Sequence, residues 1–411
     1  MPLPAAGCRV LDLTRALAGP YCTMILGDLG AEVIKVESLQ GDMSRGWGPF
    51  TDGISVYYLS VNRNKRSVAV DLHSEEGLGI VRRIASKADV VVENFRVGVA
   101  ERMGLGYDQL RAENPRLVYA SISGFGRGGP YETWPGFDQI AQGMSGLMSI
   151  TGSNGHGPLR VGIPIADTVA GMWMAIGVLA GILQQRTTGL GQRVDTSLLG
   201  GLVAMLGFQG QRYLSLGERV TATGNAHPVL APYGVFETAN GLLNIAVGTE
   251  AMWHTLCRVL ELDALADHPD YHDNSARALR RDELKRLLEE RLRHRTKEDW
   301  SRILIEAGIP SGPIYGIDEA LEDPHVLASG CIAEITHPVL GVVRQLANPV
   351  HLGGQLGGSV RLAPPALGEN TVEVLTSFGF GEATIQDFLD RKVIRDKQGD
   401  NATVASTFSV S

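Results

Sequence analysis

The feature that most constrains the fold is a regular alternation of short β-branched runs with helical segments over the first 125 residues. Strands that alternate with helices of this length indicate parallel βαβ units. The expected strands are Arg9–Leu13, Glu32–Glu37, Ser67–Leu72, Asp89–Glu93 and Leu117–Ser123. The sequence therefore predicts an α/β fold with a doubly wound, Rossmann-like parallel sheet.

Ligands of such sheets bind beyond the carboxyl ends of the strands. The expected ends are Leu13–Arg15, Glu37, Leu72–His73, Asn94–Phe95 and Gly124. No G-x-G-x-x-G follows any of these strands, and the segment Thr14–Pro20 has one glycine where a dinucleotide fingerprint needs three. This pattern disfavours an NAD- or FAD-dependent enzyme.

A long apolar helix is expected from Asp167 to about Gly189. Its apolar run, Val169–Leu183, has 15 residues, which is shorter than the roughly 20 needed to span a bilayer, so we expect a buried helix. Asp167 has two interpretations that the local pattern does not separate. It is the N-cap of this helix, or a carboxylate that the helix dipole keeps ionised beside a pocket, and both can be true together.

The sequence pattern changes in the middle of the chain. After residue 216 the sequence is rich in turns, and two short strands, Tyr233–Thr238 and Leu242–Val247, flank Ala239-Asn240-Gly241 as in a hairpin. Charged helical sequence follows up to residue 307. We expect a large domain from residues 1–200 and 330–411, a small α+β domain over 225–320, and linkers at 201–224 and 321–329.

Composition excludes several function classes. The chain has 37 Lys+Arg against 45 Asp+Glu, a net charge of −8, and no basic stripe for nucleic acid. Its four cysteines form no C-x-x-C pair and fit a reducing compartment, and the N-terminus does not resemble a signal peptide, so we expect a cytoplasmic protein without a membrane anchor. The histidines lack metal-ligand spacing. The basic cluster Asn62–Arg66 is interpreted as a solvated turn or as a phosphate contact.

Several ordered blocks carry a resemblance to a known family. They are VLDLTRALAGPYCTMILGDLGAEVIKVE, GDMSRGW, NRNKRSVAVDL, ADVVVENFRVGVAERMGLGYDQL, NPRLVYASISGFG, the G-x-P-x-x-D segment that ends at Asp167, TGLGQRVDTSLL, GIPSGPI and PALGENT. Together they cover nearly the whole chain. The sequence resembles the family III CoA-transferases, which include formyl-CoA transferase, carnitine CoA-transferase and the α-methylacyl-CoA racemases.

The resemblance implies a fold, an assembly and a site. The large domain would be built from both chain ends, two chains would interlock into a homodimer, and Asp167 would be the nucleophile. No metal or redox cofactor is implied, since the coenzyme A thioester is the substrate. The contacts to coenzyme A would come from Arg15, Ala16, Ala18, Leu72, Asn94, Phe95, Arg102 and Met103, with Lys65 or Arg66 beside the ADP moiety.

Three departures from relatives bear on the substrate. Leu17 stands where formyl-CoA transferase has a glutamine, and Gly224–Pro228 replaces its glycine run. Members with a similar block handle larger acids, several of them dicarboxylic like succinate, so His227 either binds a distal carboxylate or is a turn histidine. Phe137 stands where the racemases have a histidine, beside Asp138, which either orients the acyl group or makes an ordinary polar contact.

These observations predict an acyl-CoA:carboxylate CoA-transferase that works through an aspartyl anhydride and an aspartyl-CoA thioester. The α-proton exchange of a racemase needs two bases, and Phe137 removes one of them. The alternatives left open are a 2-methylacyl-CoA racemase and a CoA-binding protein without catalytic activity.

Overall fold

The computed structural model describes residues 2–153, 155–353 and 360–397. The chain divides into two compact units. The larger unit consists of residues 1–147, 160–215 and 324–411, and the smaller unit of residues 148–159 and 216–323.

A seven-stranded sheet forms the centre of the larger unit, in the order β14-β5-β2-β1-β6-β7-β8. Six of its strands are parallel, and their order is that of a Rossmann fold. The bounds are β1 Arg9–Asp12, β2 Glu32–Glu37, β5 Lys65–Val70, β6 Val90–Glu93, β7 Val118–Ser123, β8 Arg193–Ser197 and the antiparallel edge strand β14 Ile394–Arg395. The predicted α/β class and parallel sheet are confirmed.

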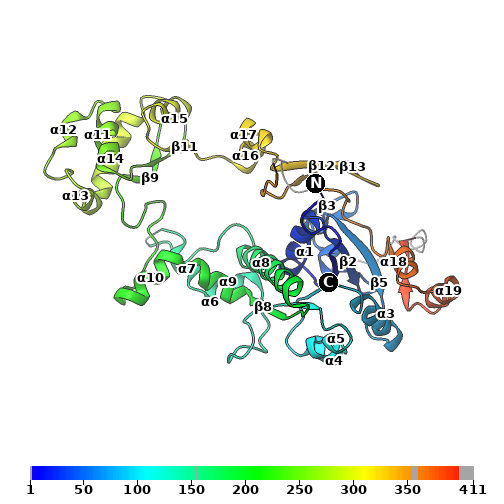
Figure 1. The fold of residues 1–411 in the computed structure, drawn as a ribbon. Coiled ribbons are helices and arrows are strands. Elements are labelled where there is room, and N and C mark those ends of the chain that lie inside the picture. The colour runs from blue at the N-terminus through cyan, green and yellow to red at the C-terminus, as the bar shows by residue number, and fades with distance from the viewer. Residues whose placement is uncertain (1, 154, 354–359, 398–411) are drawn as a thin grey trace, which may run out of the picture. The chain divides into compact units, whose positions relative to one another are not determined.

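Both faces of the sheet are covered by helices (Figure 1). Successive side chains of a strand point to opposite faces, so Val10 packs in one hydrophobic cluster and Leu11 in the other. The first cluster lies under α1 (Ala18–Asp28), α8 (Ile165–Thr188) and α9 (Leu198–Met205). The second lies under α3 (Glu75–Ala85), α5 (Tyr107–Glu113), α18 (Thr371–Ser377) and α19 (Glu382–Asp390).

Helix α8 packs closely against α1. A Cβ on Gly171 would lie 2.7 Å from the carbonyl oxygen of Ala18, so only glycine permits this approach. The close approach brings the first turn of α8 beside the first turn of α1, at the carboxyl end of β1.

Among the described residues, α8 is the one helix that is long and apolar enough to cross a membrane. Half of its most apolar window is buried within the protein, as in a core helix. The sequence predicted a buried helix, but only one face is buried. The other face exposes Met172, Trp173, Ile176 and Leu183, with exposed fractions of 41–65%.

Shorter elements complete the larger unit. They are η1 Met43–Gly46, β3 Phe50–Thr51, β4 Ile54–Ser55, α2 Val56–Val61, α4 Val99–Arg102, α6 Asp138–Met144, α10 Gly207–Leu216, α17 Pro324–Ala328, β12 Ile332–His337 and β13 Gly341–Leu346. The strands β12 and β13 pair as an antiparallel hairpin.

The smaller unit has a three-stranded antiparallel sheet in the order β11-β10-β9. Its strands are β9 Tyr233–Glu237, β10 Leu242–Ala246 and β11 Ser311–Pro313, and the predicted hairpin is confirmed. Its helices include α11 Glu250–Val259, α12 Asp263–Ala266, α13 Asn274–Leu279, α14 Arg281–Leu292, α15 Lys297–Glu306 and α16 Ile317–Glu322. Trp253 and Trp300 are buried in its core, where both indole N–H groups donate to backbone carbonyls.

Candidate active site

A cavity of about 640 Å³ opens in the larger unit at the carboxyl ends of β1, β6 and β7. This is the edge of a doubly wound sheet at which ligands bind. The structure brings nine of the sequence-derived candidates into its lining, namely Arg15, Ala16, Leu17, Ala18, Asn94, Phe95, Phe137, Asp138 and Asp167.

Four candidates lie elsewhere. Leu72 and Met103 are partly buried against the second hydrophobic cluster, and Arg102 is an exposed residue at the end of α4. None of the three belongs to the lining of this cavity. His227 belongs to the smaller unit.

The basic cluster Asn62–Arg66 was interpreted as a solvated turn or as a phosphate contact. Both interpretations are wrong for Arg63 and Lys65, because these side chains are buried. Lys65 is 1% exposed, and its Nζ lies 3.1 Å from Asp12. Arg63 is 2% exposed, and its guanidinium lies 2.6 Å from the carboxylate of Asp28. Partners from other elements neutralise both cations inside the protein, so neither side chain is available to a phosphate. Arg66 is half-buried and pairs with Glu32.

Asp167 is not the N-cap of α8. The helix begins two residues earlier, at Ile165, with Pro164 at the N-cap, so Asp167 is the third helical residue. Asp138 accepts the free N–H of Ala166 instead, at 2.7 Å. Asp138 therefore serves as the capping carboxylate from outside the helix, which leaves the carboxylate of Asp167 free for the cavity.

The electrostatics of Asp167 differ from the expectation. Burial and the negative charge of Asp138 raise the pKa of Asp167 to about 7, while a hydrogen bond from the backbone N–H of Ala18 opposes the shift. The helix dipole was expected to keep this carboxylate ionised, but desolvation and a like charge outweigh it. At neutral pH both protonation states are present, and the ionised form is poorly solvated.

Part of the wall around Asp167 comes from residues that the sequence did not predict. Trp47 and Tyr57 line the cavity with their rings edge to face, 5.1 Å apart between centroids. Burial and the charge of Asp167 raise the pKa of Tyr57 to about 12. The tryptophan of α8, Trp173, is 47% exposed and lies outside the lining. The block GDMSRGW was the one signal for Trp47, and periodicity provided none.

The loop after β1, which includes Arg15–Ala18, lines one side of the cavity. Asn94 binds Arg15 in both directions, since it accepts the backbone N–H of Arg15 and donates to its carbonyl, each at 2.8 Å. The guanidinium of Arg15 lies over the ring of Phe95, 5.1 Å from its centroid. Backbone groups of this loop therefore face the cavity in a fixed orientation. Among the described residues, no group of three His, Cys, Asp or Glu side chains could hold a metal ion.

Comparison with known proteins decides the family. The profile of CoA-transferase family III matches residues 5–371. The chain belongs to CoA-transferase family III.

Relatives of this family III chain are similar over nearly their whole length. It is 38% identical to succinyl-CoA:glutarate CoA-transferase of Homo sapiens, over 90% of this chain and 85% of the relative. It is also 38% identical to succinate–glutarate CoA-transferase of Agrobacterium fabrum, over 93% and 97%. A crystal structure of a CAIB/BAIF family protein from Brucella suis superposes with a TM-score of 0.83 at 36% identity, over 92% of this chain and all of the other.

The raised pKa of Asp167 predicts a titration that can be measured by NMR. In protein labelled with 13C at aspartate side chains, the signal that is lost in Asp167→Ala should titrate with a pKa near 7. Asp138→Asn removes the neighbouring negative charge and should lower that pKa. A signal that titrates near 4 in the wild type, or that Asp138→Asn leaves unchanged, would contradict the electrostatic interpretation.

Proposed function

We propose that this CoA-transferase moves coenzyme A between two carboxylic acids, one of them a dicarboxylic acid, with Asp167 as the nucleophile. The observation that carries the proposal is the half-buried carboxylate of Asp167, which lines a cavity of about 640 Å³ together with Ala18 and Asp138. The relatives from Homo sapiens and Agrobacterium fabrum, which are CoA-transferases for succinate and glutarate, support the substrate class.

The reaction proceeds in two matched halves. An ionised oxygen of Asp167 attacks the donor thioester, the C–S bond breaks, and an anhydride and a CoA thiolate form. The thiolate then attacks the aspartyl carbonyl, and the anhydride C–O bond breaks to release the donor acid as a carboxylate. The acceptor carboxylate attacks the resulting aspartyl thioester, the C–S bond breaks, and a second anhydride and a CoA thiolate form. The thiolate then attacks the acceptor carbonyl of this anhydride, and its C–O bond breaks to release the acceptor as its CoA thioester. No net proton is consumed, and the carboxylate of Asp167 is regenerated.

Two features of the site fit this sequence of steps. The two steps that attack the aspartyl carbonyl place negative charge on an oxygen of the aspartyl group, and the N–H of Ala18 bonds that group. Leu17, Trp47, Tyr57 and Phe95 provide an apolar wall, which limits hydrolysis of the anhydride.

We propose His227 as the donor to a distal carboxylate of the substrate. Nδ1 of His227 accepts the N–H groups of Val229 and Leu230, so its neutral ring carries the proton on Nε2 and can donate it. Tyr233, against whose ring His227 lies, and Arg281 line a groove of about 330 Å³. The Nε of Arg281 has no hydrogen-bond partner among the described residues.

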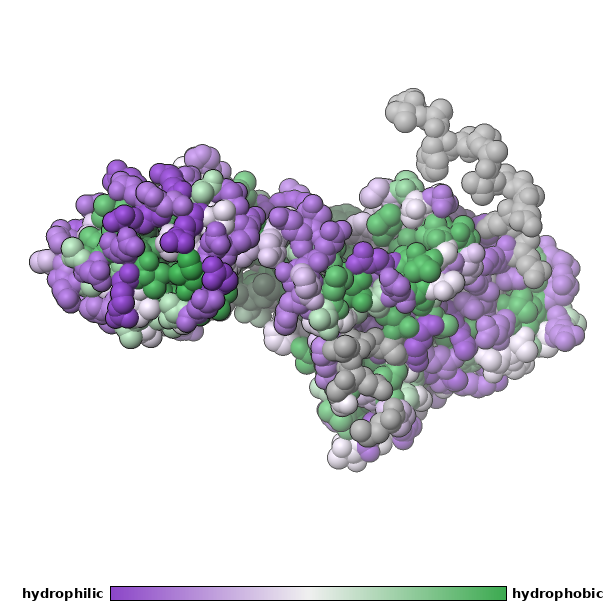
Figure 2. Space-filling view, turned by 90° about the horizontal axis from the view of Figure 1, so that it is seen from above, coloured by the Kyte–Doolittle hydropathy of each residue, from purple (hydrophilic) through white to green (hydrophobic). Residues whose placement is uncertain are grey.

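Exposed apolar side chains of the larger unit support a homodimer. Helix α10 has no buried residue, yet it carries Phe208, Tyr213 and Leu214, with exposed fractions of 56–78%. The outer face of α8 is similarly apolar. Figure 2 shows hydrophobic patches open to solvent between hydrophilic ones on this unit. Exposed apolar side chains in this number are typical of a protein–protein interface, and we propose that a second copy of the chain covers them.

The racemase alternative has less support. Phe137, which is 64% exposed, stands at the mouth of the cavity and offers no base opposite Asp167. A cytoplasmic location is also proposed, since all four cysteines are free thiols.

Asp167→Ala should abolish CoA exchange while coenzyme A still binds, because it removes the nucleophile and leaves the loop after β1 in place. Hydroxylamine added during turnover should convert Asp167 of the wild type into a hydroxamate, detected as a mass shift of its peptide. Substantial transfer by Asp167→Ala would show that another residue is the nucleophile.

His227→Ala should raise KM for dicarboxylic acceptors, by about tenfold if one charge-assisted hydrogen bond is lost, and should leave monocarboxylic acids unaffected. Initial rates with succinyl-CoA and a panel of acids measure this. The proposal fails if monocarboxylic acids react as fast as succinate or glutarate and His227→Ala changes nothing.

Light scattering should give a mass of twice the 44.1 kDa chain at all dilutions at which the protein stays folded. Interlocked chains cannot separate without unfolding. A stable, active monomer would refute the homodimer.

A further inference from the structure

The loop after β1, from Thr14 to Ala18, has an unfavourable backbone conformation at Ala16 that needs support from other residues. Ala16 has a φ of +63°, in the left-handed region that residues with a Cβ rarely occupy. Leu17 and Ala18 follow directly, and the N–H of Ala18 bonds the carboxylate of Asp167. The direction of that N–H depends on the conformation of Ala16, so whatever holds Ala16 also determines the position of the donor.

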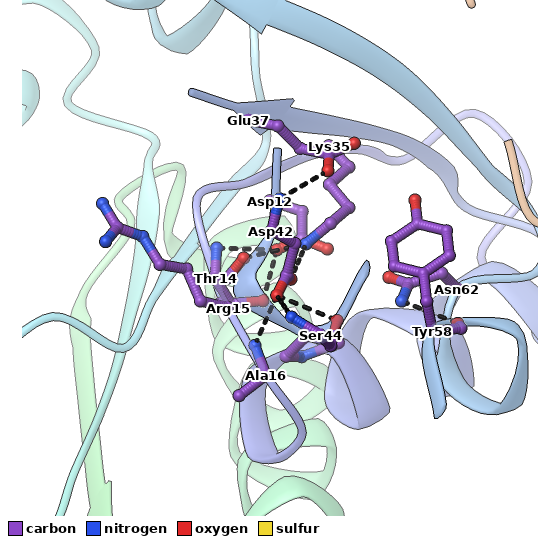
Figure 3. Close-up of polar contacts among 12 residues, drawn as sticks. Asp12, Thr14, Arg15, Ala16, Lys35, Glu37, Asp42, Ser44, Tyr58 and Asn62 are labelled. Carbon is purple, nitrogen blue, oxygen red and sulfur yellow. Dashed lines mark hydrogen bonds and ion pairs between the residues drawn. The ribbon is translucent and has the colours of Figure 1, made fainter. Parts of the chain in front are cut away.

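Asp42 holds Ala16 from outside the loop (Figure 3). Its Oδ1 accepts the backbone N–H of Ala16 at 3.1 Å, and also the N–H and hydroxyl of Ser44, each at 2.9 Å. Asp42 is 4% exposed. Its own N–H donates to Glu37 at 2.9 Å, which anchors this residue to β2.

Lys35 links the same carboxylate to the start of the loop. Its Nζ donates to Oδ2 of Asp42 at 2.9 Å and to the carbonyl oxygen of Thr14 at 2.8 Å. The side chain is fully buried in β2, so this ammonium cannot serve substrate directly. Figure 3 shows Lys35 and Asp42 meeting beside the segment from Thr14 to Ala16.

We propose that Asp42, paired with Lys35, is a positioning residue for the transfer reaction, because it holds Ala16 in the left-handed conformation that aims the N–H of Ala18 at Asp167. The inference rests on the proposed role of Asp167. Asp42 does not line the cavity, so it acts on the reaction only through the loop.

Asp42→Asn tests the proposal. The amide would present an N–H₂ group to the ammonium of Lys35, so two donors would meet and the loop would lose its charged anchor. We expect kcat to fall about 10- to 100-fold, somewhat less than the usual loss of an oxyanion donor, with KM for the acyl-CoA changed little.

The pH profile provides a readout that a merely structural role would not move. The N–H of Ala18 lowers the pKa of Asp167, so its displacement should raise that pKa and shift the acidic limb of kcat/KM to higher pH. The other charged groups that line the cavity are unchanged in the variant, as is Tyr57; they are Arg15, Arg96, Glu132, Asp138 and Arg160.

Asp28→Asn is the matched control. Asp28 is also a buried carboxylate, at 1% exposure, and its bonds go to Arg63 and Asn64, neither of which belongs to the loop. It should lower the unfolding midpoint but leave kcat and the acidic limb near their wild-type values.

Ala16→Gly added to Asp42→Asn gives an independent check. Glycine adopts a positive φ without a steric penalty, so the double variant should regain part of kcat. If Asp42→Asn does not fold, Ser44→Ala takes its place, because it removes one donor from the same oxygen without leaving a buried charge unpaired. Ser44→Ala should shift kcat and the acidic limb in the same directions, by less.

The outcomes separate the two proposals. If Asp167→Ala retains transfer, the proposed nucleophile is wrong, whatever Asp42 does. If Asp167→Ala is inactive but Asp42→Asn behaves like Asp28→Asn, or Ser44→Ala behaves like the wild type when Asp42→Asn does not fold, then the positioning role of Asp42 is refuted. Failure of Ala16→Gly to restore any kcat would refute the proposed route through Ala16.

Discussion

The buried ion pair between Asp12 and Lys65 is the interaction on which the larger unit depends. It joins the central strand β1 to β5 across β2, and both side chains are inaccessible to solvent. Burial alone would raise the pKa of Asp12, but Lys65 and Lys35 outweigh it and lower the pKa to about 2. Thr14 and Thr23 add hydrogen bonds to the same carboxylate. The end of β1, and with it the first residues of the loop after β1, is therefore held by charge inside the protein.

The contrast between Asp12 and Asp167 explains how one chain uses two buried carboxylates differently. Asp12 has cations on two sides and stays ionised, which suits a structural role. Asp167 has no ion pair with any residue that the structure describes, faces the negative charge of Asp138, and has a pKa of about 7. A carboxylate that lacks a cation and is poorly solvated is a better nucleophile than one held in an ion pair. Lys35 and Lys65 thus lie outside the lining of the cavity, where they bond Thr14 and Asp12 instead of Asp167.

The local sequence pattern predicted the helices and strands, but it did not predict where the charged residues lie. Hydrophobic periodicity located the strands of the parallel sheet, yet it started β5 at Ser67, because Lys65 and Arg66 do not look like residues of a buried strand. The small edge strand β14 was not predicted, since two residues provide no period. Asp167 was placed at the N-cap because a carboxylate before an apolar helix usually caps it, whereas Pro164 starts the helix and Asp138 accepts the free N–H.

The sequence by itself determined the α/β class, the parallel strands, the family and the candidate nucleophile, because periodicity and ordered motifs are properties of neighbouring residues. Only the tertiary structure decided which charges are partners. Asp12 and Lys65, or Asp28 and Arg63, are far apart in the chain and meet through the sheet order and the packing of α1. The pKa of Asp167 and the conformation of Ala16 depend on burial and on those distant partners. Desolvation and Coulomb interactions act through space, so no local window of sequence contains them.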